Sequence, residues 1–473
     1  MVDYDLVVIG GGSGGLVVAS AASQLKAKVA LVEKNRLGGD CLWYGCVPSK
    51  SLIHASRVAY TVNQSHRFGI NNPNPEINFT EVINYVQEVI STIEPQDSPT
   101  RFENLGVEVI FGSGKFINSQ TFVVNQRQLT ARAFVIATGS RPAIPPIPGL
   151  VEAGYLTNEE VFSLTNPPSS LGIIGGGPIG CELGQALHRL GIKVTIIQSD
   201  AQLLSKEEPE VARVVEEQLR QEGITILKET RVKRVNLVNG QKELVTDSTT
   251  ITVDAILVAT GRLPNLESLD LPSAGVEFNQ DGIKVNRKLQ TTNRKIYACG
   301  DVIGGYRFTH VAALEATVVI KNALFLPLSK INYRVIPWAT FTDPEVARVG
   351  LGEQEARQLY GNDVYILKHS FAEVDRAQTE GNTSGFVKII TRNNGEILGA
   401  HLVGPQAGEL IAEIVLAMSN GLKISALSGI HIYPTLAEVN SKVALSLTKE
   451  KYSQNLLIQR FLKHLFTWLR RLN

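Results

Sequence analysis

The motif Gly-x-Gly-x-x-Gly occurs twice in this chain, each time between an apolar run and a helix-like stretch. The first copy follows residues 5–9 and consists of Gly10, Gly12 and Gly15. The helix-like stretch 16–25 and a second apolar run, 28–32, then lead to Glu33. Glycines permit a tight turn and let backbone N–H groups approach a pyrophosphate, and a following acid can accept from a ribose hydroxyl. The pattern predicts a βαβ unit that binds a dinucleotide.

The second copy follows residues 171–174 and consists of Gly175, Gly177 and Gly180. A helix to about residue 190 and a strand at 193–197 are expected, and Gln198 then stands where the first copy has its acid. A carboxylate there would repel a ribose 2′-phosphate, so Gln198 favours NADP over NAD. No arginine follows directly, and NADH remains possible. Two dinucleotide sites in one chain imply two cofactors that exchange electrons.

Composition excludes several classes of protein. The 473 residues suggest about three domains, and 46 Lys plus Arg against 45 Asp plus Glu argue against a dedicated nucleic-acid binder. The first residues show no basic and apolar leader, and no apolar run reaches the roughly 18 residues of a transmembrane helix, so a cytoplasmic location is expected. Too few cysteines are present for a disulfide-stapled scaffold or a multi-zinc protein. The four cysteines of the chain are Cys41, Cys46, Cys181 and Cys299.

Cys41 and Cys46 follow directly on the first nucleotide unit. Five positions along a continuous helix separate residues by about 7.5 Å, whereas a disulfide needs Cα atoms within about 7 Å. The pair can close only if the helix start is distorted, which Gly45 and Pro48 allow. Two unpaired buried thiols are one interpretation. The neighbouring nucleotide unit favours the other, a dithiol that cycles between reduced and oxidised forms. Cys181 and Cys299 are expected to be buried packing thiols.

Residues 38–50 resemble the redox-active segment of the flavin-dependent pyridine nucleotide–disulfide oxidoreductases, a family that includes dihydrolipoamide dehydrogenase, glutathione reductase and mercuric reductase. The resemblance covers about residues 3–450, with further matching segments at 137–139, 259–265, 297–301 and 308–312. It implies FAD, a nicotinamide cofactor, a homodimer, and an α/β fold with two Rossmann-like dinucleotide-binding domains plus a C-terminal α+β dimerisation domain. The implied domains are 1–148 (FAD, first part), 149–271 (NAD(P)), 272–333 (FAD, second part) and 334–450 (dimerisation).

The resemblance also implies roles for single residues. Cys46 resembles the thiol that faces the flavin and forms a charge-transfer complex, and Cys41 resembles the interchange thiol that meets the substrate. Lys50 resembles the lysine near flavin N5, and Glu182 its ion-pair partner. Cofactor contacts are implied at Gly10, Gly12, Gly15, Glu33, Lys34, Gly39, Lys50, Thr138, Gly139, Gly175, Gly177, Gly180, Gln198, Gly261, Arg262, Gly300, Asp301, His310 and Ala312.

The segment 429–438 bears on the substrate. Disulfide reductases of this family place an acid–base histidine where this chain has Tyr433, with a glutamate, here Glu438, five residues later. That histidine serves the partner subunit. Tyrosine has an ordinary pKa near 10 and is a poor base at neutral pH. Mercuric reductases carry tyrosine there, so the resemblance implies reduction of Hg(II) to Hg(0), with Cys41 and Cys46 holding the metal transiently. His431 could supply a base instead.

Other functions stay open at this stage. Mercuric reductases typically end in a vicinal cysteine pair, and no cysteine follows Cys299 here. A dihydrolipoamide- or glutathione-type disulfide reductase is therefore an alternative. So is a quinone or metal-ion reductase of loose specificity. A sensor or binding module that keeps the nucleotide folds without turnover is disfavoured by the cysteine pair together with Lys50 and Glu182.

The end of the chain, residues 451–473, is predicted to include a basic amphipathic helix. From residue 455 it runs for about five turns. Leu457, Phe461, Leu465 and Leu469 recur every four residues, and the charged side chains are Arg460, Lys463, Arg470 and Arg471, with no acid. Such a helix either docks on the protein's own dimer surface or lies shallowly on a membrane surface.

Overall fold

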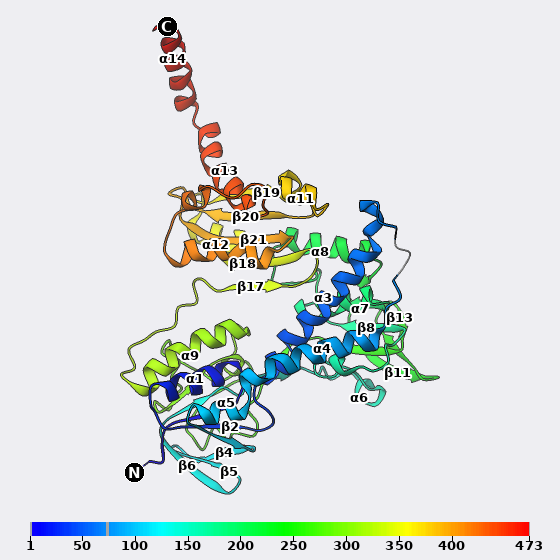
Figure 1. Ribbon diagram of the computed structural model, residues 1–473, viewed down its shortest axis with the longest axis vertical. Coiled ribbons are helices and arrows are strands. Elements are labelled where there is room, and N and C mark those ends of the chain that lie inside the picture. Colours follow the sequence, from blue (N-terminus) through cyan, green and yellow to red (C-terminus); the bar gives the residue numbers. More distant parts are fainter. Residues whose placement is uncertain (1, 72–74, 473) are drawn as a thin grey trace. The chain divides into compact units, whose positions relative to one another are not determined.

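A computed structural model describes residues 2–71 and 75–472 of the chain (Figure 1). Met1, where the predicted FAD domain begins, and Asn473, where the predicted tail ends, lie outside the described residues. The chain forms two compact units. One contains Met1–Ala201 and Ile224–Asn332, and the other Gln202–Gly223 and Tyr333–Asn473. The finer division into five segments stays a prediction.

The largest sheet of the first unit has the strand order β3-β2-β1-β6-β5-β4, and β16 pairs in addition with the C-terminal part of β6. Pairing is parallel from β3 to β6 and to β16, and antiparallel from β6 to β4. Its strands are β1 (Tyr4–Ile9), β2 (Val29–Glu33), β3 (Val107–Phe111), β4 (Gly114–Asn118), β5 (Thr121–Val124), β6 (Arg127–Ile136) and β16 (Ile296–Ala298). The parallel strands β1 and β2 are buried along nearly their whole length, which explains their continuous apolar sequence.

Helices α1 and α9 lie side by side against this sheet (Figure 1). The helices of this part are α1 (Ser13–Gln24), α2 (Gly39–Trp43), α3 (Cys46–Asn63), α4 (Phe79–Ile93), α5 (Pro99–Asn104) and α9 (Thr309–Leu324). Short 3₁₀ turns are η1 (Ser65–Phe68), η2 (Glu94–Asp97) and η4 (Asp301–Ile303). The predicted strand, turn, helix and strand of the first copy are thus confirmed as β1, α1 and β2.

The second copy forms its own parallel sheet, in the order β10-β9-β8-β14. Its strands are β8 (Ser170–Ile174), β9 (Lys193–Ile197), β10 (Thr225–Leu227) and β14 (Ala255–Val258). The expected helix between β8 and β9 is α7 (Pro178–Arg189). The first unit also contains a three-stranded antiparallel sheet and a two-stranded antiparallel sheet. They comprise β11 (Arg234–Val238), β12 (Gln241–Val245), β13 (Thr250–Val253), β7 (Ser140–Pro142) and β15 (Arg262–Pro264), with α6 (Leu150–Ala153) and η3 (Val161–Ser163).

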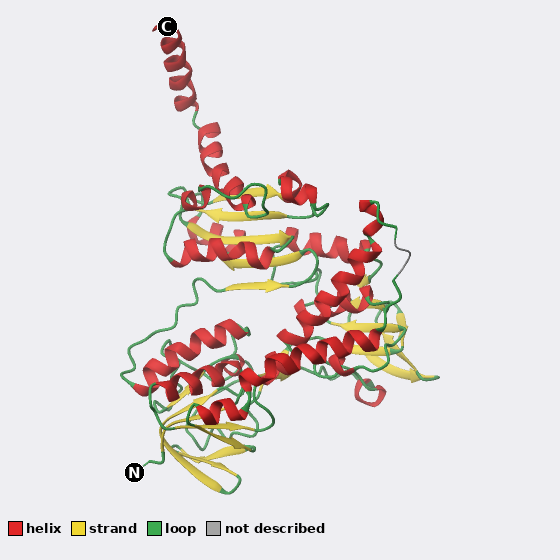
Figure 2. Cartoon of the chain, viewed as in Figure 1, coloured by secondary structure: helices red, strands yellow, loops and turns green. Residues whose placement is uncertain are grey.

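The second unit is built on an antiparallel sheet in the order β17-β18-β21-β20-β19 (Figure 2). Its strands are β17 (Pro337–Thr340), β18 (Glu345–Gly350), β19 (Tyr365–Ser370), β20 (Phe386–Thr391) and β21 (Ile397–Gly404). Its helices are α8 (Pro209–Gln221), α10 (Glu353–Tyr360), α11 (Asp375–Thr379), α12 (Ala407–Ser419), α13 (Glu438–Gln454) and α14 (Leu456–Leu472), with η5 (Phe371–Glu373) and η6 (Ile424–Ser428). The expected α+β character of this part is confirmed.

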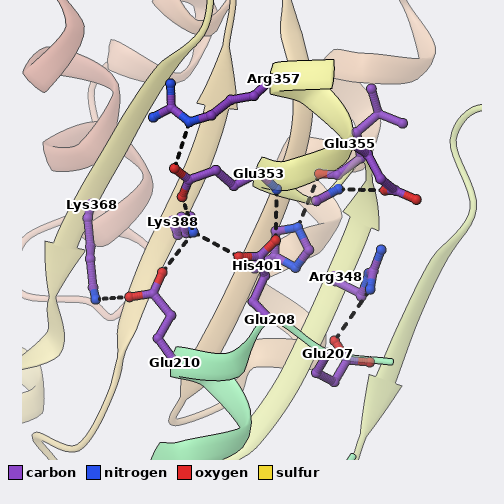
Figure 3. A network of polar contacts seen from close by, with 12 residues as sticks. Glu207, Glu208, Glu210, Arg348, Glu353, Glu355, Arg357, Lys368, Lys388 and His401 are labelled. Atoms are coloured by element: carbon purple, nitrogen blue, oxygen red, sulfur yellow. Dashed lines mark hydrogen bonds and ion pairs between the residues drawn. The ribbon is translucent and has the colours of Figure 1, made fainter. Parts of the chain in front are cut away.

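A buried ion network joins α8 to this sheet (Figure 3). Lys388 on β20 is 2% exposed, and its ammonium lies 2.9 Å from Glu208, 2.8 Å from Glu210 and 2.7 Å from Glu353. Burial alone would raise the pKa of these carboxyls, but hydrogen bonds from lysine and arginine side chains outweigh it and lower each pKa. The network fixes the start of α8 within the second unit.

Candidate functional site

The helix breaks between the two cysteines, as their spacing requires. Cys41 lies in α2 and Cys46 is the first residue of α3, with Gly45 between the helices in a non-helical conformation. The cysteines are present as free thiols. The hydroxyl of Thr309, at the start of α9, lies 3.2 Å from Sγ of Cys41 and 3.5 Å from Sγ of Cys46. The two sulfurs therefore share one polar neighbour.

The two thiols differ in acidity. A hydrogen bond from Cys41 lowers the pKa of Cys46 to about 6, although burial works against it, and Thr309 and the charge of Lys50 add to the lowering. The same hydrogen bond to Cys46, together with burial, raises the pKa of Cys41. At neutral pH the pair therefore carries one thiolate, on Cys46, and one thiol, on Cys41.

Lys50 and Glu182 form an ion pair. Nζ of Lys50, on α3, lies 2.9 Å from Oε2 of Glu182, on α7. Glu182 is buried, at 7% exposure, whereas the lysine side chain keeps about a third of its surface. Lys50 follows Cys46 by one helical turn, so its charge faces the thiolate side of α3.

The first glycine turn approaches its own chain very closely. A Cβ on Gly15 would lie 1.9 Å from the carbonyl oxygen of Gly10, so no side chain fits there. Gly39, at the start of α2, has φ +58°, and a Cβ on it would lie 2.7 Å from Cα of Gly12. This contact places the cysteine segment directly on the turn. Glu33 accepts the Gly11 N–H at 2.7 Å.

The second turn repeats this geometry. A Cβ on Gly180 would lie 2.0 Å from the carbonyl oxygen of Gly175. Gln198 accepts the Gly176 N–H at 2.8 Å, in the way that Glu33 serves the first turn. Its amide nitrogen donates to Asp200 at 3.0 Å. Gly177, which caps α7, has nothing within 4 Å of an added Cβ, so the open face of this turn fits a phosphate group.

The remaining predicted cofactor residues fall into two groups. Around the segment after β16, the Gly300 N–H donates to buried Glu315 at 2.6 Å, and Ser140 donates to Asp301 at 2.5 Å. Arg262 joins this group, because its guanidinium lies 3.2 Å from Asp40 and donates to Ser140. The others lie at the surface or in tight packing. Lys34, His310 and Gly261 are exposed, Thr138 and Gly139 bond to Asn265, and Ala312 packs near Gly14.

In the second unit, Tyr433 is exposed and donates its hydroxyl hydrogen to Asp375 at 2.9 Å. This hydrogen bond and the aspartate charge raise the pKa of Tyr433, which keeps it a neutral phenol at neutral pH. Glu438, five residues on, begins α13. One of its carboxylate oxygens is buried without a hydrogen-bond partner among the described residues.

His431 contacts a different carboxylate from the one that Tyr433 contacts. Its Nε2 lies 3.2 Å from Glu413 on α12, and its Nδ1 lies 2.9 Å from the carbonyl oxygen of Gly429. Burial alone would lower the pKa of His431, but these two contacts outweigh it and raise the pKa. Both ring nitrogens face acceptors, so the protonated imidazolium satisfies both contacts.

The other two cysteines are buried, as expected. Cys181 is 0% exposed and contacts the Gly176 carbonyl oxygen at 3.4 Å. Cys299 is 1% exposed, and burial raises the pKa of its thiol. Neither is a candidate nucleophile.

Several site residues were missed at the sequence level. Thr309 lies inside the segment 308–312 that matches the family, and its hydroxyl could have indicated a hydrogen-bond partner for the cysteines. Glu315, Glu413 and Asp375 carry no sequence signal, because each meets its partner only through the fold.

Comparison with known proteins places this geometry in a family. The family model described as pyridine nucleotide-disulphide oxidoreductase matches residues 4–316, and that of its dimerisation domain matches residues 336–444. The chain belongs to this family. It is a flavoprotein oxidoreductase of a family that uses FAD and NAD(P)H, and it contains a dimerisation domain.

Relatives with different substrates resemble the chain about equally. A mercuric reductase from Staphylococcus aureus is 36% identical over 461 residues, which cover 95% of this chain and 83% of the relative. A dihydrolipoyl dehydrogenase from Bacillus subtilis (strain 168) is 34% identical over 456 residues, with 93% and 98% covered. The solved Cu(II) complex of the HOCl-induced flavoprotein disulfide reductase RclA from Escherichia coli aligns with a TM-score of 0.85 at 28% identity, covering 94% of this chain and 99% of that one.

The chain's own residues fit the two cofactors. Both turns are closed by a glycine that packs on the turn's own backbone, Gly15 on Gly10 and Gly180 on Gly175, and each presents backbone N–H groups at the start of a helix, where a pyrophosphate would bind. Glu33, the last residue of β2, and Gln198, the residue after β9, stand where a ribose would lie.

Proposed function

We propose that the chain is an NADPH-dependent flavoprotein that reduces thiol-bound Hg(II), or another soft metal ion, to the metal. The observation that carries this proposal is Tyr433, a hydrogen-bonded phenol of raised pKa at the position where disulfide reductases place a base. Breaking a disulfide requires a proton for the departing thiolate. Moving Hg(II) between thiolates requires little proton delivery, because the metal takes the proton's place.

The cysteine pair supports this chemistry. Cys46 supplies a thiolate, and Cys41 gives up its proton as it binds the metal, so both sulfurs can hold one Hg(II). When bound, FAD carries two electrons from the nicotinamide to this site. For Hg(II) delivered as a dithiolate, the balance is Hg(SR)₂ + NADPH + H⁺ → Hg⁰ + 2 RSH + NADP⁺. The positive charge of Lys50, held by Glu182, stabilises the Cys46 thiolate between turnovers.

We further propose that the protein works as a homodimer in the cytoplasm. By resemblance to the family, Tyr433 of one protomer serves the cysteine pair of its partner. The dimerisation domain supports this assembly.

A second function, disulfide reduction, is favoured by one observation. His431 has a carboxylate partner, Glu413, in the arrangement that a general acid–base uses. If His431 took that role, the chain would reduce lipoamide or glutathione disulfide, and His431→Ala would abolish the activity.

Substitution of Tyr433 tests the proposal. Tyr433→Phe should lower Hg(II) turnover several-fold, because the phenolic oxygen is lost, and Tyr433→His should raise disulfide reduction. NADPH oxidation with Hg(II) and excess thiol, and separately with lipoamide, measures both. Lipoamide reduction by the wild type at the rate of a dedicated disulfide reductase, lost in His431→Ala, would replace this proposal by the second function.

A further inference from the structure

The last helix, α14, has one continuous apolar face. Asn455 caps it by accepting the Ile458 N–H at 3.0 Å. At 3.6 residues per turn, one side of the helix is entirely apolar. That apolar face consists of Leu457, Ile458, Phe461, Leu462, Leu465, Trp468, Leu469 and Leu472.

This apolar face is open in the structure. None of the described side chains of α14 is buried, and Leu457 is 76%, Phe461 64% and Trp468 57% exposed. Contiguous apolar surface of this kind marks an interaction site. Gln459 donates to the carbonyl oxygens of Tyr452 and Ser453 at the end of α13, and Arg470 donates to Thr467 within α14 itself. Figure 2 shows α14 following directly on α13.

The charge of the opposite face indicates the partner. It carries Arg460, Lys463, Arg470 and Arg471, and the helix has no acidic residue. Because the whole chain has a net charge of only +1, the rest of the chain is net negative. Cations that flank an apolar face, with an aromatic residue on that face, match the headgroup layer of an anionic bilayer.

We propose that α14 docks the protein on an anionic lipid surface, with the helix lying in the plane of the interface. No helix in the described residues, 2–71 and 75–472, is long and apolar enough to cross a bilayer. The 17 residues of α14 span about 25 Å, and the cations along its length hold it at headgroup depth. This inference goes beyond the proposed reaction and does not depend on the electron acceptor.

Vesicle flotation of the FAD-loaded, full-length protein tests this docking. Vesicles of phosphatidylcholine with about 30% phosphatidylglycerol should bind at least about tenfold more protein than pure phosphatidylcholine, and about 500 mM salt should reverse most of this binding. On the anionic vesicles, tryptophan emission should shift to the blue, and Trp468→Phe should remove the shift.

Matched variants separate the apolar face from the polar one. Phe461→Asp combined with Leu465→Asp should abolish flotation, whereas Thr467→Ala, a change on the cationic face that removes no charge and no apolar side chain, should leave it unchanged. Because these side chains are not buried in the structure, the substitutions should leave the fold intact. The flavin spectrum of each variant checks this. Absence of flotation, or equal binding to neutral vesicles, would overturn the proposal. If truncation after Gln454 instead dissociates the dimer and no vesicle binds, the helix docks on a second copy.

Discussion

At the scale of single residues, Cys41 and Cys46 differ because of where each stands on its helix. Cys46 opens α3, and the hydrogen bond from Cys41, the Thr309 hydroxyl and the charge of Lys50, one turn further on, lower the pKa of its thiol. Cys41 lies inside the short helix α2 and donates its hydrogen to Cys46. The thiolate and the thiol therefore have separate tasks.

Serine substitutions should distinguish the two sulfurs. Cys46→Ser should abolish the long-wavelength charge-transfer absorption of the two-electron-reduced protein, because it removes the thiolate that the resemblance to the family assigns to the flavin. Cys41→Ser should show that absorption without added reductant, because Cys46 can no longer form a disulfide. Identical visible spectra for the two variants would contradict the assignment.

The same absorption should titrate with the Cys46 thiol. The thiolate exists above its pKa, so the band should be present at neutral pH and fall to half its intensity near the pKa of about 6. Lys50→Met removes a positive charge and should raise the midpoint by about 1 pH unit. Glu182→Gln removes the negative charge that compensates the lysine, so this variant should not raise the midpoint. An unchanged midpoint in Lys50→Met would show that the lysine does not act on this sulfur.

At the scale of elements, the attachment of α8 to the C-terminal sheet depends on Lys388. Replacing it by Met leaves three carboxylates beside an apolar side chain, which typically costs about 3 kcal/mol or more. Hydrogen exchange of the β20 and β21 amides should report this loss as faster exchange. Lys368→Ala is the control, because its more exposed pair with Glu210 should contribute under about 1 kcal/mol.

The pH dependence of this loss has a definite sign. The folded-state pKa values of Glu208, Glu210 and Glu353 lie below the ordinary value of 4.5. Their ionised forms therefore stabilise the fold above pH 4.5, and this contribution is lost as the pH falls through the lowered folded values. The difference between wild type and Lys388→Met should shrink on acidification. A difference that grows at low pH would contradict the network's role.

Elements with a strong local pattern were predictable from the sequence. The expected strand at 193–197 is β9, and the helix expected to end at about residue 190 is α7, which ends at Arg189. Apolar periodicity and glycine spacing act over a few residues, so the sequence contains them directly. The grouping of residues 202–223 with the C-terminal unit was not predictable, because the ion pair and the backbone hydrogen bond that Glu208 makes join residues more than 100 positions apart in the chain.

The same distinction applies to the site. The cysteine pair and the Lys50–Glu182 pair follow from motif positions, but Thr309 bridges the sulfurs only because α9 packs beside α1. The sequence offers His431 as an alternative base, but only the fold shows its partner, Glu413 on α12. Contacts of this kind are set by packing, which single-sequence reasoning does not supply.

At the scale of the whole molecule, the choice of nicotinamide cofactor depends on the second turn. Gln198 stands where the first copy has the acid Glu33. The kcat/KM for NADPH should therefore be at least about tenfold higher than that for NADH, a difference of roughly 1.4 kcal/mol. Gln198→Glu should reverse the preference. Asp200, whose carboxylate meets the Gln198 amide, works against a 2′-phosphate, so Asp200→Asn should strengthen the preference. A clear NADH preference in the wild type would refute this prediction.

The central claim is that a thiolate–thiol pair that is served by a tyrosine, and not by a base of neutral pKa, reduces a soft metal ion faster than it reduces a disulfide substrate. The most direct measurement is the steady-state kcat/KM for NADPH oxidation by the FAD-loaded protein, with Hg(II) in excess thiol set against lipoamide and glutathione disulfide, and with released Hg(0) vapour collected. We predict that Hg(II) is the preferred acceptor by at least about tenfold and that one Hg(0) leaves per NADPH consumed. Faster turnover of either disulfide, with no Hg(0) released, would contradict the account.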